Sequence, residues 1–261
     1  MAFTVHAVMP GVWHIVDCMG VCMTLLEGEN AAMLVDTGYG IEDVADFMRH
    51  MTDLPLTVFL THNHHDHAMG ARCFPETYML EADMADWRMF TNDEMRRRVL
   101  TQAIGKNLPV DEKTFLAGEI PLPKVMKPGV IDLGGLTAEI IEAPGHTPGS
   151  AVVYLPERKL LLSGDDWNPC TWLFFPQALG LREYRSNMRG IQQLPFEKVL
   201  CPHREALYDR WMFDDFFNAL TDGNLRAAEP VNIAPYEQID TCQATLPHDQ
   251  VLVFDWAKSG L

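Results

Sequence analysis

The segment 57–67 carries the densest group of chemically active side chains in this sequence. A short apolar, β-branched run from Thr57 to Leu60 predicts a buried strand, so the residues after it are expected in the loop at the strand's carboxyl end. Four histidines and one aspartate occupy positions 62–67 of that loop. Burying so many imidazoles without a charged partner is costly, so the loop predicts a metal site rather than a structural role.

The spacing of these ligands predicts two adjacent metal ions. In an extended loop, His62 and His64 project to the same side. Asp66 and His67 stand at the start of a following helix and can turn towards a second point nearby. The pattern His-x-His-x-Asp-His therefore supplies ligands for a pair of metals.

Three later side chains occupy similar positions, each directly after a predicted strand. His146 lies between two prolines and two glycines, in a rigid loop that can aim a ring nitrogen. Asp165 follows a glycine and is interpreted as a bridging ligand, with Asp166 as a solvated neighbour or a helix cap. His203 follows the last predicted strand and is the natural third ligand of the second metal.

Residues 62–67 resemble the first metal motif of the metallo-β-lactamase-fold hydrolases, with Asn63 and His65 as the intervening positions. The other motifs follow in the family's order across residues 31–203. The resemblance implies an α/β fold, a four-layer αββα metallo-β-lactamase sandwich with the site on one edge. It also implies that Asp36 orients the metal loop, and a simple turn cap is an equal alternative for this residue.

The expected centre has seven ligands. Three imidazoles bind one metal, two imidazoles and a carboxylate bind the other, and a further carboxylate bridges them: His62, His64 and His146; Asp66, His67 and His203; and Asp165. Imidazole and carboxylate ligands without thiolate suit zinc, although iron and manganese also accept them. We therefore expect two Zn²⁺ as cofactors, with Fe or Mn as alternatives.

Two adjacent metals predict a hydrolase, because such a pair can hold a bridging hydroxide and polarise a carbonyl or phosphoryl oxygen. The resemblance makes Asp66 the catalytic residue that orients the hydroxide and carries its proton. True β-lactamases of the family have Cys or Ser at the position of Asp165, and flavodiiron relatives have Glu at that of His64. Both activities are therefore disfavoured.

The remaining expectation is a zinc-dependent metallo-hydrolase of the glyoxalase II-like or lactonase-like branch, acting on a carboxylic ester, thioester or lactone small molecule. No clear basic cluster follows His203 to hold glutathione carboxylates. A mononuclear iron persulfide dioxygenase shares much of the histidine pattern and stays an alternative, as does a phosphodiesterase. A non-enzymatic metal-binding scaffold is disfavoured because all seven ligand positions are filled.

The rest of the sequence predicts the scaffold for these loops. Short apolar or alternating runs separated by Gly and Pro predict strands in both halves. A helix with a buried face is expected at residues 44–51, and helical spacing without strand signals predicts a helical insertion at about 81–120. The predicted strands are 3–6, 12–17, 21–27, 31–35, 57–60, 130–133, 136–142, 151–155, 160–162 and 198–201.

Two further segments leave alternatives open. The aromatic stretch 167–175 places Trp167 and Trp172 as candidate substrate contacts, and packing beneath the insertion or a subunit interface would explain it equally well. The basic triplet 96–98 is interpreted as a solvated helix face. The C-terminal extension, about 227–261, is expected to add an edge strand or to mediate a homodimer.

Composition sets the remaining limits. The 261 residues, 48% of them apolar, are enough for a single metallo-β-lactamase-fold domain spanning 1–261. A formal net charge of −16 disfavours nucleic acid and anionic membranes as partners and leaves a small-molecule substrate. Six scattered cysteines predict reduced thiols, and the N-terminus resembles no export signal, so a soluble cytoplasmic protein is expected.

Overall fold

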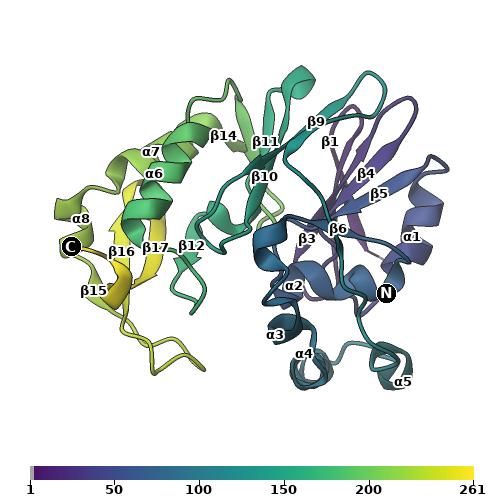
Figure 1. Ribbon diagram of the computed structural model, residues 1–261, viewed down its shortest axis with the longest axis horizontal. Helices are drawn as coiled ribbons and strands as arrows, with labels where there is room; N and C mark the ends of the chain where they lie inside the picture. Colours follow the sequence, from purple (N-terminus) through teal and green to yellow (C-terminus); the bar gives the residue numbers. More distant parts are fainter. Residues whose placement is uncertain (1–2) are drawn as a thin grey trace.

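Three β-sheets form the scaffold of this chain. Within residues 3–261, which the computed structural model describes, the sheets contain seven, six and four strands. The first two pack face to face and carry helices on their outer faces (Figure 1). Met1 and Ala2, which the predicted domain range includes, lie outside the described residues.

The seven-stranded sheet holds the strands predicted in the N-terminal half. It runs in the order β1 (Thr4–Met9), β2 (Val12–Val16), β3 (Cys22–Glu27), β4 (Ala32–Val35), β5 (Leu56–Phe59), β6 (Tyr78–Met79) and β7 (Lys124–Val125). Successive side chains of a strand point to opposite faces, so Leu25 packs with helix α1 (Val44–Met51) and Leu26 packs in the core between the sheets.

The six-stranded sheet holds the strands predicted after the insertion. Its order is β14 (Tyr208–Asp209), β13 (Lys198–Leu200), β11 (Leu160–Leu162), β10 (Ala151–Leu155), β9 (Thr137–Glu142) and β8 (Gly129–Asp132). In the core between the sheets, Met33 and Phe59 belong to the same apolar cluster as Val153 and Leu160. Helices α6 (Leu181–Ile191) and α7 (Arg210–Ala219) cover the outer face of this sheet. The predicted αββα sandwich is confirmed.

The four-stranded sheet is not anticipated by the sequence pattern. Its order is β12 (Cys170–Leu173), β17 (Gln250–Asp255), β16 (Thr241–Leu246) and β15 (Glu229–Pro230). The aromatic segment therefore forms a strand that pairs in parallel with the C-terminal extension. The extension adds strands as expected, but they build a separate sheet beside α6 and α8 (Asp222–Arg226) instead of extending a main sheet (Figure 1).

The predicted insertion is helical, with α3 (Trp87–Thr91), α4 (Asp93–Gly105) and α5 (Glu112–Phe115). The interpretation of the basic triplet as a solvated face is wrong for Arg96. Its guanidinium is buried and donates to the carbonyls of Phe115, Ala117 and Gly118, because the chain after α5 folds back over α4. Arg97 and Arg98 are exposed as predicted.

Strand direction brings the ligand loops to one edge of the sandwich. β4 and β5 are parallel, and β9, β11 and β13 share one direction because β10 is antiparallel to both β9 and β11 while β11 and β13 are parallel. The carboxyl ends therefore share one edge within each sheet. The two edges meet, because ligand atoms from the loops after β5, β9, β11 and β13 lie within 4.8 Å of one another in groups of three. Helix α2 (His65–Ala68) and short 3₁₀ helices at Met69–Cys73, Glu81–Asp83, Pro156–Arg158, Gly164–Asp166, Pro247–Asp249 and Trp256–Lys258 complete the described elements. None of the helices in residues 3–261 has the length and apolarity that crossing a membrane requires.

Candidate metal centre

The first group of ligands consists of three buried histidines. His62 and His64 lie just after β5 of the seven-stranded sheet, and His146 follows β9 of the six-stranded sheet. One ring nitrogen from each lies within 4.8 Å of the others. His64 Nδ1 is 2.8 Å from His146 Nε2, so both nitrogens face the same point. We call these three residues the histidine pocket.

The second group combines Asp66, His67 and His203, again with one ligand atom from each within 4.8 Å of the others. The Nε2 atoms of both histidines lie 3.6 Å from Asp66 Oδ2. His67 is buried, whereas Asp66 and His203 are partly exposed. We call this group the carboxylate pocket; Asp66 and His203 line the cavity described below.

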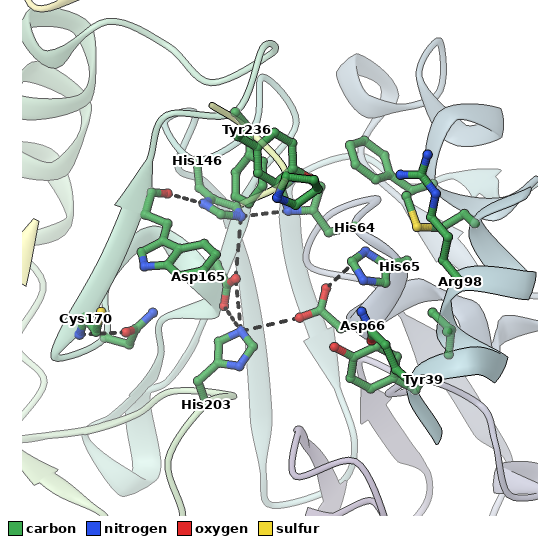
Figure 2. Close-up of a pocket in the computed structure, with 18 of the residues that line it drawn as sticks. Tyr39, His64, His65, Asp66, Arg98, His146, Asp165, Cys170, His203 and Tyr236 are labelled. Atoms are coloured by element: carbon green, nitrogen blue, oxygen red, sulfur yellow. Dashed lines mark hydrogen bonds and ion pairs between the residues drawn. The ribbon is translucent and has the colours of Figure 1, made fainter. Parts of the chain in front are cut away.

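Asp165 stands between the two pockets. Its Oδ2 atom is 3.5 Å from the Nε2 atoms of both His67 and His146 and 4.0 Å from that of His62. His203 Nε2 lies 3.1 Å from each of its carboxylate oxygens. This placement suits a carboxylate shared by two cations (Figure 2).

Several inward-facing atoms of the centre lack a hydrogen-bond partner among the described residues. They are His62 Nε2, His67 Nε2 and Asp165 Oδ1, and all three are buried. These three residues also form a third group whose ligand atoms lie within 4.8 Å of one another. Buried polar atoms are rarely left without partners, so converging lone pairs of this kind fit metal cations.

The outward ring nitrogens of three histidines are held by hydrogen bonds. His67 Nδ1 donates to Asp36 Oδ2 at 3.0 Å, and His146 Nδ1 donates to the carbonyl of Trp172 at 2.6 Å. His62 Nδ1 lies 3.0 Å from the hydroxyl of Thr61. Such bonds place the proton on Nδ1 and leave the Nε2 lone pair free to face the centre.

Asp36 organises both pockets. Besides accepting from His67, its carboxylate accepts from the backbone amide and the hydroxyl of Thr61, which in turn contacts His62. Its backbone φ of 64° is unusual for a residue other than glycine and marks a conformation that the surroundings impose. The sequence left two roles open for Asp36, orientation of the metal loop and a simple turn cap. These contacts fit orientation of the metal loop.

Burial sets the protonation of the histidine pocket. Desolvation lowers the pKa values of His62 and His64 well below that of an ordinary histidine, and it lowers the pKa of His146 in the same direction. The three rings are therefore held neutral, which is the form that binds metal.

Nearby carboxylates set the protonation of the carboxylate pocket. Burial alone would lower the pKa of His67, but the charges of Asp165 and Asp66 outweigh it and hold that pKa well above its ordinary value. The pKa of His203 is raised against burial in the same way, chiefly by Asp165. In return, His203 and His67 overcome the effect of burial and hold the pKa of Asp165 well below its ordinary value.

Asp83, at the entrance to the helical insertion, is a supporting residue that the sequence reasoning missed. Its carboxylate accepts from the backbone amides of Asn63 and Gly149 and from the hydroxyl of Thr147. It thereby joins the loop of His62 to the loop of His146. A β-carbon at Gly149 would come within 2.7 Å of the Asp83 carboxyl carbon, so only glycine permits this approach.

The interpretation of Asp166 as a solvated residue is wrong. Its side chain is buried, and Oδ1 accepts from the backbone amide of His146 at 3.0 Å. The loop therefore turns this side chain inwards against the His146 loop. Asp165 instead faces the centre (Figure 2). Burial raises the pKa of Asp166 well above its ordinary value.

A cavity of about 490 Å³ opens onto the centre. His64, Asp66, His146, Asp165 and His203 form part of its lining. Side chains of the insertion, the aromatic segment and the C-terminal extension supply apolar wall around it, among them Phe90, Met95, Val99, Trp172, Phe175, Pro235 and Tyr236. Figure 2 shows Tyr39 and Arg98 on one side of this space and Cys170 on the other.

The two tryptophans proposed as substrate contacts lie in different surroundings. Trp172 is 37% exposed and lines the cavity. Trp167 is fully buried in the core with Phe213, and its indole nitrogen donates to Gln250. The prediction for Trp167 is therefore wrong: this side chain packs beneath β12, because the chain turns between the two residues.

Two arginines at the cavity were not expected from the sequence. Arg98 comes from α4, and Arg204 follows directly after His203. Arg98 pairs with Glu94 at 2.6 Å, and Arg204 donates to the carbonyl of His203. Neither belongs to a basic run after His203, so only the folded chain reveals that both border one cavity.

Comparisons with known proteins agree with this architecture. The sequence model of the metallo-beta-lactamase superfamily matches residues 16–203. Acyl-coenzyme A thioesterase MBLAC2 from Gallus gallus is 26% identical over 200 residues, which cover 69% of this chain and 70% of that protein.

Solved structures share the fold. A metallo-beta-lactamase from Pontibacter korlensis superposes with a TM-score of 0.60 at 18% identity, over 83% of this chain and 98% of that one. The sec-alkylsulfatase Pisa1 from Pseudomonas sp. reaches a TM-score of 0.63 at 16% identity, over 86% of this chain and 43% of that one. Neighbours with such different titles show a common fold and leave the substrate open.

The chain therefore belongs to the metallo-beta-lactamase superfamily. It is a hydrolase of that superfamily, and its described residues include His and Asp groups that can hold metal ions.

Proposed function

We propose that this protein is a binuclear metal-dependent hydrolase of acyl thioesters, with carboxylic esters as secondary substrates. The observation that carries the proposal is the pair of ligand groups joined through Asp165 at the floor of a largely apolar cavity. Zinc is the proposed metal, since the ligands are imidazoles and carboxylates without a thiolate. When bound, two such cations supply an activated water and polarise the acyl carbonyl.

The residues of the carboxylate pocket have separate roles in this proposal. His67 and His203 would hold one cation, and Asp165 lies where it would be shared by both cations. Neighbouring histidines outweigh burial and lower the pKa of Asp66 to about 2, so its side chain is an ionised carboxylate with free oxygen lone pairs. It orients the attacking water, accepts its proton and passes that proton to the thiolate released when the C–S bond breaks.

The lining of the cavity favours a substrate in which an apolar acyl group is attached to an anionic carrier. Phe175 and Trp172 offer an aromatic wall beside His146, with Phe175 and His146 ring centroids 5.3 Å apart. Arg98 and Arg204 add positive charge at the same cavity of a chain whose formal net charge is −16. The thioesterase title of the 26% identical relative agrees with this substrate class.

A substrate panel tests the proposal. Thioesters, lactones, aryl esters, β-lactams and phosphodiesters are assayed with the zinc-loaded protein, and the highest kcat/KM is expected for a thioester. Trp172→Ala should weaken that best substrate by roughly 1 to 3 kcal/mol of transition-state binding and leave metal content unchanged. Trp211→Ala is the matched control, because Trp211 is exposed outside the cavity lining. Strong phosphodiester cleavage without ester or thioester turnover contradicts the proposal.

The arginines are tested by comparing an acyl-coenzyme A with the neutral S-acyl-N-acetylcysteamine that carries the same acyl group. Arg98→Ala and Arg204→Ala should each raise KM for the anionic substrate by about threefold to tenfold at low salt, because rim charges act mainly through steering. The neutral substrate should be unaffected. Arg97→Ala removes an equal charge from the same helix outside the cavity lining and should change neither KM.

A further inference from the structure

His64 differs from the other histidines of the centre in the nitrogen that faces inwards. Its Nδ1 atom lies 2.8 Å from His146 Nε2, whereas His62, His67 and His146 turn Nδ1 outwards. The outward atom of His64 is therefore Nε2. A side-chain amide, that of Gln177, lies 2.7 Å from it.

The Gln177 amide has a partner for only one end. Its nitrogen points at His64, while its buried oxygen Oε1 has no hydrogen-bond partner among the described residues. The oxygen and nitrogen of an amide occupy nearly equivalent positions, and the surrounding hydrogen bonds decide between them. A His64 ring that offers its Nδ1 lone pair to a metal carries its proton on Nε2. The group opposite Nε2 must then be an acceptor.

We propose that Gln177 is a positioning residue of the metal centre. With the amide turned by half a rotation, Oε1 accepts the Nε2–H of His64, and the amide nitrogen takes the place that Oε1 leaves. This bond fixes the tautomer and the ring orientation that direct Nδ1 into the histidine pocket. The inference rests on the proposed metal centre and not on the identity of the substrate.

Lys258, from the C-terminal extension, holds the loop that carries Gln177. Its ammonium donates to the carbonyls of Phe175 at 3.3 Å, Pro176 at 2.6 Å and Ala178 at 3.0 Å. An ammonium has three donors, and these three carbonyls flank Gln177 on both sides. The C-terminal extension therefore fixes the backbone from which the Gln177 side chain reaches His64.

Two more contacts fix the same loop. The backbone amide of Leu179 donates to the carbonyl of Gly145 at 2.9 Å, next to His146. A β-carbon at Gly180 would lie 2.7 Å from the backbone oxygen of Lys258, so the extension packs directly on the loop. A continuous path of contacts thus runs from Lys258 through the Gln177 loop to His64.

Metal affinity of two variants tests the role of Gln177. Gln177→Leu keeps the size of the side chain but removes the acceptor, and it should weaken binding of zinc in the histidine pocket by about 10- to 100-fold. Gln177→Glu keeps an acceptor and cannot donate, so it should bind zinc as well as the unaltered protein does. Affinity is measured by competition with a chromophoric chelator, and cobalt(II) absorption reports the ligand geometry without any substrate.

Matched controls separate this role from simple misfolding. Gln193→Leu makes the same change at an exposed glutamine and should leave zinc affinity unchanged. Thermal unfolding of each metal-free variant checks the fold. If Gln177→Leu binds zinc normally, or if Gln177→Glu loses as much affinity as Gln177→Leu, the proposal is overturned.

A double substitution tests the contribution of Lys258. Lys258→Met should weaken zinc binding less than Gln177→Leu, and adding it to Gln177→Leu should cause no further loss, because both act through one contact path. Lys127→Met, at an exposed lysine, is the control. If the loss of zinc affinity in the double variant equals the product of the two single losses, this part of the proposal is overturned. These experiments use no substrate. They therefore test the roles of Gln177 and Lys258 in metal binding even if the protein is not a thioesterase.

Discussion

The histidine pocket and the carboxylate pocket are neighbours with opposite electrostatic surroundings. In the first, burial lowers the pKa values of His62, His64 and His146. In the second, carboxylates raise those of His67 and His203 in spite of burial. The first pocket thus offers neutral imidazoles, while the second offers charge and an opening to the cavity. Asp165 supplies negative charge to both pockets, so we expect the binding of two metal ions to depend on this residue.

The largest expected effect comes from removing that shared charge. Asp165→Asn should lose one of two metals and reduce kcat/KM by about 10³-fold, equivalent to ~4 kcal/mol, because a neutral amide cannot hold two cations together. Metal analysis and steady-state kinetics measure both losses.

Asp166→Asn is the matched control for this change. Burial raises the pKa of Asp166, and an asparagine oxygen can still accept from the His146 amide, so metal content and activity should stay close to normal. A larger loss in Asp166→Asn than in Asp165→Asn would reverse the assignment of the two carboxylates.

A smaller effect should distinguish the pockets. Asp36→Ala removes the acceptor of His67 Nδ1–H, so the carboxylate pocket should bind metal about 10- to 100-fold more weakly. The histidine pocket should lose less, because Asp36 reaches His62 only through Thr61. Stepwise zinc titration resolves the two sites, and Asp53→Ala, at an exposed aspartate, is the control. Equal weakening of both sites would contradict this difference.

The smallest expected effects are in the stability of the metal-free protein. Histidines with lowered pKa resist protonation in the folded state, so the histidine pocket should lose stability as pH falls below the ordinary value of 6.5. His67 and His203 have raised pKa values, so their contribution is complete below 6.5 and is lost as pH rises through those values.

Urea unfolding at a series of pH values measures how the free energy of unfolding changes with pH on the acid side and on the alkaline side. His146→Phe should flatten the acid side, and His203→Gln should flatten the alkaline side. If His203→Gln altered only the acid side, the charge difference between the pockets would be wrong.

Much of the centre was predictable because its ligands follow local rules. A ligand-rich loop directly after an apolar strand is visible in sequence, which applies to His62, His146 and His203. Asp83 and Gln177 gave no such signal, since their roles depend on loops brought together by the fold. Hydrogen bonds from Asp83 join two ligand loops, and Gln177 reaches His64 from 113 positions away.

The scaffold likewise has parts that local sequence patterns predict and parts that they do not. Apolar or alternating runs predicted most strands of the two main sheets but missed the two-residue strands β6, β7 and β14. The pairing of β12 with β17 joins segments about 80 residues apart that no local pattern connects. Side-chain direction was also beyond the sequence. Asp165 and Asp166 have the same chemistry, and a single residue step turns one to the centre and the other into the core.

Metal content tests the central claim most directly. Elemental analysis of freshly purified protein, with oxygen uptake measured in parallel, should find about two transition-metal ions per chain, chiefly zinc, and no oxygen consumption. The same analysis of Asp165→Asn should find about one ion. A single iron per chain in the unaltered protein, with persulfide-dependent oxygen uptake, would contradict the two-metal hydrolase.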